Sequence, residues 1–423
     1  MRIDRLRLTN YRGFASQVFD LHPRFTLFVG DNATGKTSIL DALTVAMDSW
    51  FIGMKAGEPT GGFSVSEVRL ATHRYDDRFS FEPQYPTQVE AWGVVMDRQV
   101  SWSRELIQQK GRTTTSGSRD LTYLSADADR RVREGVEVDL PLLCSYGPER
   151  LWWETPQRKR KVPEREALRP SRFDGYRLST AFEIQETPLL EWIKSEISVS
   201  QQTGKETSGL TVMKTALLSC VEDAVDLYYD PRIADLVLVM EDREPQVFDN
   251  FSAGQRVMVT LIGDLVRRAI TLNPHMGREV LERIVGIIAI DELDLHLHPK
   301  WQRRIIGDLK RTFPRIQFVA TTHSPQMIGE ALPEEIRLLE NWNVFTPDYS
   351  FGVDSNRILQ ELMQASPRNE KTQHLLSELA EKVDSEDMDS AKKLVGRLTE
   401  ELGEGDPEVT RANTLIGMLE STR

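Results

Sequence analysis

Residues 28–40 read Phe-Val-Gly-Asp-Asn-Ala-Thr-Gly-Lys-Thr-Ser-Ile-Leu, and this stretch decides the fold. Gly30 and Gly35 enclose four residues, and Lys36 and Thr37 follow at once, which is the spacing of a phosphate-binding loop. Glycines let backbone N–H groups curl around phosphate oxygens, and a helix that begins here directs its positive end at them. In this motif the lysine neutralises the β- and γ-phosphates, and the threonine hydroxyl binds Mg²⁺.

The flanking residues supply the strand and the helix that this loop requires. Residues 25–29 form a mostly apolar run, and residues 38–43 carry apolar side chains at helical spacing. Because a chance match on a glycine-rich turn would lack both neighbours, we interpret the stretch as strand, phosphate-binding loop and helix.

The composition of the whole chain limits the classes of protein to which it can belong. The 423 residues are 39% hydrophobic, enough for two or three domains, and no apolar run has the roughly 18 residues of a membrane span. The start of the sequence lacks signal-peptide features, and Cys144 and Cys220 lack metal-type spacing, so we expect a cytoplasmic protein with no membrane partner. A net charge of −12 argues against binding nucleic acid with the whole surface, although it allows one local basic groove.

Alternating side chains predict antiparallel strands in the N-terminal third of the chain. Residues 2–8 and 19–21 flank a turn and are expected to pair, and residues 87–106 predict a second hairpin that turns at 96–98. Residues 111–119 are rich in Thr, Ser and Gly, which indicates a loop. Residues 139–144 predict a short buried strand.

An inserted lobe is expected next. Residues 180–198 and 209–229 look helical, without the sustained heptads of a coiled-coil arm. The basic run at 158–161 is either a solvated loop or a contact to a phosphate backbone. Trp152 and Trp153 favour packing in a core or a lid, with stacking on a base as the alternative.

A helix with a conspicuous first turn is expected from residue 252 onward. Ser252 and Gln255 have the spacing of a capping box, which explains both residues structurally. Capping does not explain Gly254, because glycine costs helix stability unless a ligand approaches the backbone there.

Two further buried strands end in polar residues. Residues 284–290 are almost entirely Ile, Val and Ala and end in Asp291-Glu292, whose side chains point to opposite faces. The carboxyl end of such a strand is where doubly wound sheets bind ligands. A second strand at 316–320 leads to His323, for which we favour a catalytic role over a structural one because it is the third polar feature at this edge.

The segment between these strands allows a metal-site alternative. Asp294, His296 and His298 could be read as metal ligands, but no fourth ligand is evident. Pro299 reads better as the first residue of a helix. That helix is expected to bury Trp301, Ile305, Leu309 and Phe313.

The character of the sequence changes from Asp348 onward. Helices are expected at 370–383, 385–402 and 407–419. Residues 370–404 contain ten Asp or Glu against five Lys or Arg. This acidic surface suits either contacts with another protein or a solvated helical tail.

Four ordered motifs resemble those of the ABC/SMC-type ATPases of the compact RecF-like branch. The motifs are residues 30–37, 251–255, 287–292 and His323. Residues 294–301 followed by Thr-His-Ser-Pro at 322–325 resemble the bacterial AAA-type ATPases of the virulence or phage-defence group. Septu PtuA-type subunits, which work with an HNH nuclease, are the nearest resemblance in that group, and residues 146–152 resemble a further family block.

The resemblance implies an α/β fold: an ABC-type P-loop NTPase with a mixed sheet, an inserted helical lobe and a helical C-terminal tail. The nucleotide-binding core is expected at 1–50 and 240–345, and an antiparallel β and loop part at 51–145. The inserted helical lobe is expected at 146–239, and a partner-binding helical tail at 346–423.

The resemblance also implies ATP and Mg²⁺ as ligands and a role for each motif residue. The residues expected to cradle the phosphates are Asp31, Asn32, Ala33, Thr34, Gly35, Lys36, Thr37 and Ser38, with Arg12 reaching toward them. Thr37 would hold the metal directly, and Asp291 would hold it through water. Glu292 would activate the attacking water. His323 would sense the γ-phosphate. Ser252, Gly254 and Gln255 would close over ATP bound to the opposite protomer. A glutamine is expected after 140–144, but Tyr146-Gly147 stands there, so the metal-sensing glutamine stays unassigned.

Several functions share such an ATPase. We favour a sensor and gate of an anti-phage defence complex, which forms an ATP-dependent dimer or higher homo-oligomer and controls a nuclease or toxin effector, HNH-type if Septu-like. The alternative is a stand-alone RecF-like repair or maintenance ATPase that binds DNA, or RNA, through residues 158–161. A nuclease of the overcoming-lysogenization type would need a Glu and a strand-end Asp-x-Asp after His323, which the sequence lacks. The long insertion disfavours an energy-coupling transporter subunit.

Overall fold

The chain forms two compact units, Met1–Val353 and Asp354–Arg423. The computed structural model describes residues 1–55, 62–148, 170–182, 186–221, 224–233, 235–241 and 244–421. The basic run at 158–161 and the pair Trp152 and Trp153 lie outside the described residues, so the predictions made for them stay predictions. Residues 346–353, expected to begin the tail, belong to the first unit.

A six-stranded sheet in the order β15-β14-β3-β13-β12-β8 forms the centre of the first unit, with β15 antiparallel to β14 and the other neighbours parallel. The strands are β3 (Phe25–Gly30), β8 (Leu142–Tyr146), β12 (Gly286–Ile290), β13 (Ile316–Thr322), β14 (Ile336–Glu340) and β15 (Asn343–Phe345). Every residue of β8, β12 and β13 is buried, as expected for parallel strands covered on both faces. The expected mixed sheet is confirmed, and β8 belongs to it rather than to the antiparallel part.

A four-stranded antiparallel sheet in the order β2-β1-β6-β7 forms a second layer. It contains β1 (Arg2–Tyr11), β2 (Phe14–Asp20), β6 (Thr87–Val95) and β7 (Arg98–Leu106). Both predicted hairpins are confirmed. The second one turns through Met96 (φ 50°) and Asp97 (φ 60°), the left-handed pair that a two-residue hairpin turn requires.

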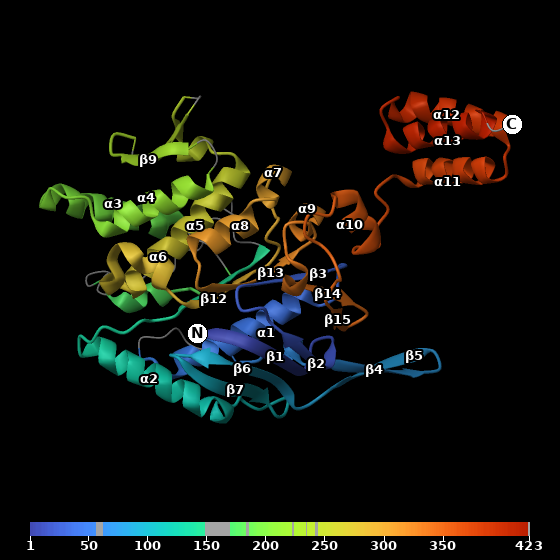
Figure 1. Ribbon diagram of the computed structural model, residues 1–423. Coiled ribbons are helices and arrows are strands. Elements are labelled where there is room, and N and C mark those ends of the chain that lie inside the picture. The colour runs from blue at the N-terminus through green and yellow to red at the C-terminus, as the bar shows by residue number, and fades with distance from the viewer. Residues whose placement is uncertain are drawn as a thin grey trace. The chain divides into compact units, whose positions relative to one another are not determined.

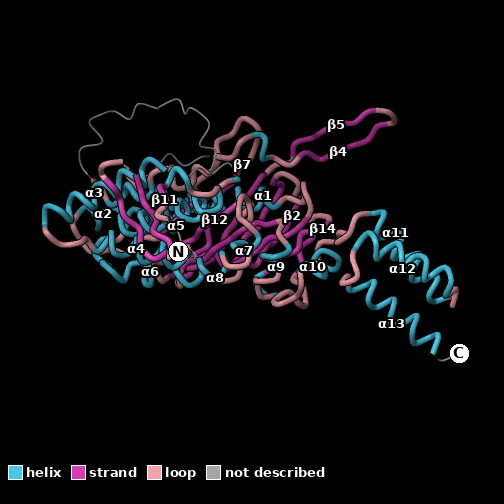
Figure 2. The backbone as a smooth tube through the Cα atoms, turned by 90° about the horizontal axis from the view of Figure 1, so that it is seen from above, coloured by secondary structure: helices cyan, strands magenta, loops and turns pink. Residues whose placement is uncertain are grey.

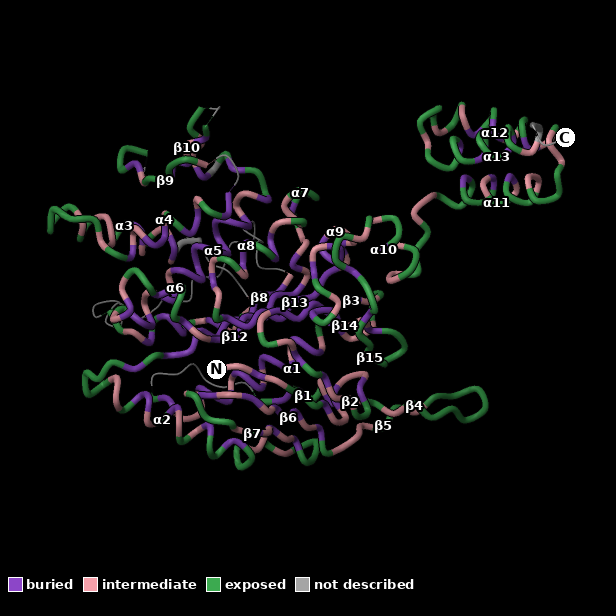
Figure 3. The backbone as a smooth tube through the Cα atoms, viewed as in Figure 1, coloured by how far each residue is buried: buried purple, intermediate pink, exposed green. Residues whose placement is uncertain are grey.

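Helix α1 (Lys36–Asp48) lies between the two sheets (Figure 1). Its apolar residues are buried on both sides, and Trp102 Nε1 of β7 donates a hydrogen bond of 2.9 Å to the carbonyl of Ala46. Helix α5 (Ala253–Leu272) covers the opposite face of the six-stranded sheet, and buried residues run through both layers (Figure 3). Because the phosphate-binding loop joins β3 to α1, these layers fix its position.

The inserted lobe contains strands that the sequence analysis did not predict. Helices α3 (Glu186–Thr203) and α4 (Ser208–Cys220) are followed by an antiparallel sheet. Its strands are β9 (Ala224–Asp230), β10 (Asp235–Met240) and β11 (Gln246–Val247). The prediction of helix at 224–229 was wrong. Residues Val225 to Tyr229 favour a strand, and β10 pairs with them along its length.

Three other segments also differ from the expectations. Helix α2 (Arg119–Arg133) was missed because its buried face is built largely from small and polar residues, including Ser125, Ala128 and Asp129. The hairpin of β4 (Leu70–Tyr75) and β5 (Arg78–Pro83) extends away from the sheets (Figure 2) and was also missed. The single helix expected after Pro299 is two helices, α7 (Pro299–Gln302) and α8 (Ile305–Thr312).

The remaining helices of the first unit are short, and the second unit is helical. The short ones are α6 (Val280–Arg283) and α9 (Pro325–Ile328). The second unit contains α10 (Ser355–Glu361), α11 (Glu370–Asp384), α12 (Met388–Leu402) and α13 (Pro407–Ser421), which confirms the three helices expected there. Leu375, Leu379, Val395, Leu398 and Ile416 belong to a core shared by α11, α12 and α13. Among the described residues, no helix has the length and apolar character to cross a membrane.

Candidate nucleotide-binding site

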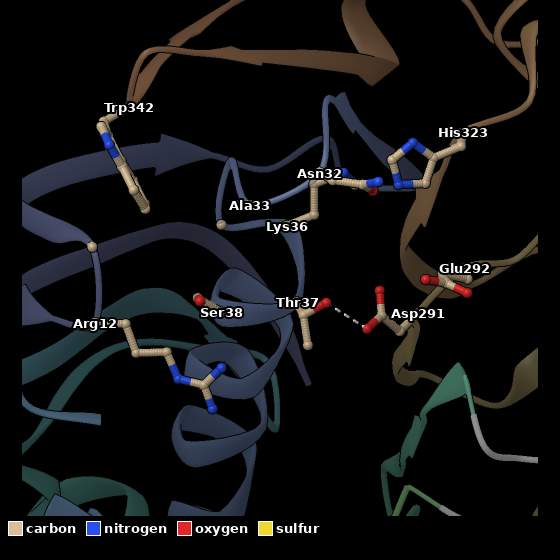
Figure 4. A pocket seen from close by; sticks show the side chains of 12 residues that line it. Arg12, Asn32, Ala33, Lys36, Thr37, Ser38, Asp291, Glu292, His323 and Trp342 are labelled. Carbon is tan, nitrogen blue, oxygen red and sulfur yellow. Dashed lines mark hydrogen bonds between the residues drawn. The ribbon is translucent and has the colours of Figure 1, made fainter. Parts of the chain in front are cut away.

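A cavity of about 300 Å³ opens at the carboxyl ends of β3, β12 and β13 (Figure 4). Its lining residues are Arg12, Gly13, Asn32, Ala33, Gly35, Lys36, Thr37, Ser38, Asp291, Glu292, His323 and Trp342. Ten of them were named from the sequence as site residues. Asp31 and Thr34 belong to the same loop without lining the cavity, and Thr34 Oγ1 donates a hydrogen bond of 2.8 Å to the carbonyl of Asp31.

The loop between β3 and α1 needs its two glycines for different reasons. Gly35 precedes the first residue of α1 with φ 95°, a conformation that side chains disfavour. A Cβ there would lie 2.8 Å from the ring of Phe14. A Cβ at Gly30 would lie 2.6 Å from the carbonyl oxygen of Leu339 on β14. The loop therefore passes closer to its neighbours than any side chain would allow.

Lys36 is folded back onto this loop. Its Nζ donates hydrogen bonds of 2.8 Å to the carbonyls of Gly30 and of Asp31. Burial lowers the pKa of Lys36, and the nearby carboxylates of Asp291 and Asp31 oppose that shift. The ammonium group thus stands at the floor of a cavity bordered by backbone N–H groups, where a phosphate would meet both.

Thr37 and Asp291 meet across the cavity from neighbouring elements. Thr37 Oγ1 at the start of α1 donates a hydrogen bond of 2.8 Å to Asp291 Oδ2 at the end of β12. Thr321 Oγ1 on β13 donates to the other carboxylate oxygen, Oδ1, and so fixes the orientation of the group. Mg²⁺ in nucleotide sites takes one or two hard protein oxygens besides phosphates and water, so this pair fits it.

Glu292 and His323 face the same end of the cavity from adjacent loops (Figure 4). Glu292 has φ 47°, an uncommon conformation for a residue with a side chain, and its backbone N–H donates 2.7 Å to Thr321 Oγ1. The backbone N–H of His323 donates 3.3 Å to Asp294 Oδ1, which also accepts from Thr322 Oγ1. Local hydrogen bonds therefore determine where both side chains emerge.

Arg12 lies at the other end of the cavity, next to acidic residues that the sequence analysis had not assigned. Its Nη2 is 2.6 Å from Asp41 Oδ2 on α1 and 4.0 Å from Glu67 Oε1. Burial raises the pKa of Asp41 to about 6, although the charge of Arg12 opposes the shift. Tyr11 OH donates 2.9 Å to the same Glu67 oxygen, so the arginine is held from two sides.

The start of α5 does not line this cavity. Ser252 and Gln255 form the expected capping box, with Ser252 N–H donating 2.9 Å to Gln255 Oε1 and Gln255 N–H donating 3.3 Å to Ser252 Oγ. Gly254 has a neighbour within the chain, because a Cβ there would lie 2.8 Å from the ring of Trp301, and its expected role toward ATP of the opposite protomer stays a prediction. Packing of that indole is a sufficient reason for glycine.

Asp294 and His298, two of the three residues of the metal-site alternative, have local partners. His298 caps α7, with Nδ1 accepting 3.3 Å from the N–H of Lys300, and Asp294 accepts from Thr322. Across the described part of the chain, no three His, Cys, Asp or Glu side chains gather as a metal site. Tyr146, which stands where a glutamine was expected, is buried and donates 2.8 Å from its hydroxyl to Asp264 Oδ2.

Sequence reasoning missed three residues of the site. Thr321 reads as the end of a buried strand, and only its place beside Asp291 reveals what its hydroxyl holds. Gly13 follows the assigned Arg12 in the β1–β2 turn, and Trp342 comes from the β14–β15 turn, outside every recognised motif. An aromatic residue in a two-residue turn is the one signal that could have drawn attention to Trp342.

Comparisons with known proteins agree with this geometry. A family model described as an AAA domain matches residues 5–207, and one described as an AAA domain, putative AbiEii toxin, Type IV TA system, matches residues 221–328. The Retron Ec83 probable ATPase of Escherichia coli is 26% identical, with 96% of this chain and 85% of that protein aligned. The Retron Vc95 probable ATPase of Vibrio cholerae is 38% identical over 31% of this chain and 24% of its own length.

Two further comparisons are more partial. The Septu protein PtuA of Bacillus thuringiensis is 33% identical over 27% of this chain and 32% of its own length. Among solved structures, an Smc head bound to the C-winged helix domain of ScpA aligns with 83% of this chain and 98% of its own, at 13% identity and a TM-score of 0.47. The two AAA-domain models together include every lining residue of the cavity except Trp342. The chain therefore carries AAA-type ATPase domains and is similar to the ATPases named in retron and Septu systems, and it is an ATP hydrolase.

Proposed function

We propose that this defence-associated ATPase is the gate of an anti-phage complex: two copies close around ATP, and hydrolysis of that ATP controls an associated nuclease or toxin. One observation carries the proposal. Lys36, Thr37, Asp291, Glu292 and His323, which come from three neighbouring strand ends, all line one cavity. An ATPase needs a phosphate cation, metal oxygens and a base at such a distance from one another that one triphosphate can touch them all.

The chemistry proposed for the cavity is positioning and charge neutralisation of the transferred phosphoryl group. The loop N–H groups and Lys36 hold the β- and γ-phosphates, and Thr37 and Asp291 supply the oxygens that suit a metal. When bound there, Mg²⁺ would neutralise charge on the phosphate oxygens. Asp291 is kept in place for this role by Thr321.

Glu292 is the proposed general base. A water oxygen attacks the γ-phosphorus, and the bond from that phosphorus to the β,γ-bridging oxygen breaks. The Glu292 carboxylate accepts a proton from the attacking water. The products are ADP and phosphate. His323 borders the same end of the cavity and would donate to the γ-phosphate. In this proposal Glu292 accepts the proton, and His323 recognises the γ-phosphate.

The proposal includes a second copy of the chain, supported by the start of α5. Ser252 and Ala253 are exposed there, Gln255 is half-buried, and none of them lines the cavity of its own chain. A helix start with exposed N–H groups attracts phosphate. In the proposed dimer these residues close over ATP bound to the other copy, as the family resemblance implies.

The second unit is the proposed attachment point for the effector. Helices α11 to α13 share a core of their own, and the surface around it is acidic. The likeness to Septu PtuA and the toxin named in the second family model support a nuclease, of HNH type if the system is Septu-like, or a toxin. Two free, buried cysteines suit a cytoplasmic setting for such a complex.

The test uses Glu292→Gln, which keeps the shape of the side chain but cannot accept the proton. The full chain, expressed with its neighbouring genes and purified with ATP, is weighed intact by native mass spectrometry. We expect a dimer with ATP retained and a second protein in fixed ratio. The matched control adds Lys36→Met to Glu292→Gln, and this double variant is expected to be monomeric because it cannot hold ATP.

Two outcomes would contradict the proposal. If Glu292→Gln hydrolysed ATP at the wild-type rate, Glu292 would not be the base. If its dimers carried nucleic acid and no second protein, the stand-alone DNA ATPase would replace the gate as the function.

A further inference from the structure

We propose that Trp342 is the platform on which the base of the bound nucleotide stacks. This inference rests on the proposed binding of ATP in the cavity and identifies the part of the cavity that takes the nucleoside. Trp342 lines the cavity together with Arg12, Gly13 and the phosphate-binding loop. An aromatic platform recognises the flat face that every base presents.

The backbone that carries Trp342 is in an unusual conformation. Asn341 (φ 50°) and Trp342 (φ 64°) form the turn between β14 and β15, and both lie in the left-handed region. Asparagine tolerates this conformation, whereas a bulky aromatic residue rarely adopts it. The two-residue turn itself requires such a left-handed pair, as at Met96 and Asp97, and it places the Trp342 side chain beside the strand ends that border the cavity.

The indole of Trp342 is held tightly along one edge. A Cβ at Gly13 would lie 1.9 Å from its Cη2 atom, and a Cβ at Gly35 would lie 3.1 Å from its Cζ3 atom. The ring of Phe14 contacts it edge to face, with centroids 5.1 Å apart and planes at 89°. Two glycines and one phenylalanine thus form a seat for this side chain, which fixes its orientation before any ligand binds.

Trp342 is nevertheless 44% exposed. Figure 4 shows the indole nearly edge-on, with one flat face toward Ala33 and the space of the cavity. A tryptophan in the core would bury both faces of its ring. The exposed apolar face instead offers area that a base could cover.

The order of the residues along the cavity determines which part of ATP would reach Trp342. Asp291, Glu292 and His323 gather at one end, Lys36 lies in the middle, and Arg12 and Trp342 lie at the opposite end (Figure 4). The γ-phosphate must face Glu292 for hydrolysis. The nucleoside is therefore directed away from the carboxylates, toward the indole.

The test compares a ligand that has a base with one that lacks it. Binding of Mg-ATP and of Mg-tripolyphosphate to the full chain is measured by titration calorimetry for the wild type, Trp342→Leu and Trp342→Phe. We expect Trp342→Leu to weaken ATP binding about tenfold, as loss of one base–aromatic stack does, and to leave tripolyphosphate binding unchanged. Trp342→Phe keeps an aromatic face and should retain most of the affinity for ATP.

A second variant tests the seat of the indole instead of the indole itself. Gly13→Ala places a methyl group where the ring now lies, so it should displace the indole and reproduce the selective loss of ATP affinity. An equal loss of ATP and tripolyphosphate would overturn the proposal, because Trp342 would then only support the phosphate-binding loop. Unchanged affinity for both ligands in Trp342→Leu would overturn it as well.

The outcome is separable from the proposed function. If the defence-complex proposal fails, no second protein accompanies Glu292→Gln, yet the ratio of ATP to tripolyphosphate affinity is still measured. If ATP does not bind in this cavity at all, Lys36→Met leaves its affinity unchanged, and that result identifies the failure as one of the site.

Discussion

The cavity at the strand ends and the first turn of α5 both contain glycines at the start of a helix, and the two glycines have different neighbours. The start of α1, after Gly35, opens onto the space that Lys36 and Thr37 also border. Both glycines lie against an aromatic ring, Phe14 for Gly35 and Trp301 for Gly254, but Gly254 does not line the cavity. A glycine at a helix start therefore shows that something approaches closely, without saying whether that is a ligand or the protein itself.

The hydroxyl residues of the two regions differ in the same way. Thr37, on α1, donates its hydroxyl hydrogen bond to Asp291, which directly follows β12, and this makes it part of a shared polar site. The Ser252 hydroxyl oxygen instead accepts a hydrogen bond from the backbone N–H of Gln255 in the capping box. The cavity is a functional arrangement within one chain, whereas the start of α5 would become one only when a second chain supplies the phosphate.

The largest expected effect comes from removing the charge at the centre of the cavity. Lys36→Met keeps the length of the side chain, but the phosphates lose their cation. We expect the affinity for ATP to fall about 100-fold, because a charge-assisted bond to a buried anion contributes roughly 1.5–3 kcal/mol. Titration with labelled ATP measures it. Lys55→Met, the same change at an exposed lysine, is the control, and equal affinities in both variants would remove Lys36 from the site.

The next effect tests the role of the start of α5. Ala253→Glu places a carboxylate at an exposed position of the first turn, where it favours the helix electrostatically but repels a phosphate. We expect ATP hydrolysis to fall about tenfold or more, since two like charges near a protein surface repel by several kcal/mol at contact. ATP affinity of the isolated chain should be unchanged. Ala253→Gln has nearly the same shape without the charge and should hydrolyse ATP normally.

Mixing two inactive variants tests whether this role is exercised on another chain. Lys36→Met loses its own ATP but keeps an intact α5, and Ala253→Glu has the reverse defect. Mixed dimers would contain one complete site, so hydrolysis should reappear on mixing, measured as phosphate release. If the mixture stays inactive, the start of α5 does not act on the ATP of a second chain.

A smaller effect is expected for the residue that orients the metal-facing carboxylate. Thr321→Val keeps the shape of the side chain but removes the hydroxyl that donates to Asp291. We expect the Mg²⁺ concentration for half-maximal hydrolysis to rise about tenfold, as when an outer-shell partner is lost. Thr26→Val, in the buried strand β3, removes a hydroxyl bonded to the N–H of His22 and is the control. Equal Mg²⁺ dependence in both variants would contradict the role of Thr321.

These regions also show what the sequence can reveal. Residues 30–37, Asp291, Glu292 and His323 could be placed in one site because strand ends of a parallel sheet meet at one edge. Thr321 and Trp342 could not, since a threonine in a strand and a tryptophan in a turn acquire their roles only from contacts across the fold. The same holds for the close approach of Trp301 to Gly254, because the two residues lie far apart along the chain.

The sequence likewise predicted some elements of the fold and missed others. Uninterrupted apolar runs and clean alternation predicted β12, β13 and both hairpins of the antiparallel sheet. Helix α2 was missed because Ser125, Ala128 and Asp129 on its buried face do not form an apolar stripe. Residues 224–229 were taken for helix because their pairing with β10, which makes them a strand, is a tertiary interaction.

The smallest expected effect on hydrolysis comes from removing the second unit. A chain that ends at Val353 retains the cavity, and α11, α12 and α13 bury their apolar residues mainly against one another. We therefore expect its ATP hydrolysis to match that of the full chain, while the second protein no longer copurifies with Glu292→Gln. Leu398→Asp in the full chain, which places a charge in the helical core, should likewise lose the partner, and Lys393→Asp at a neighbouring exposed position should keep it. If the shortened chain failed to hydrolyse ATP, the second unit would be part of the ATPase, and the division between a catalytic unit and an attachment unit would be wrong.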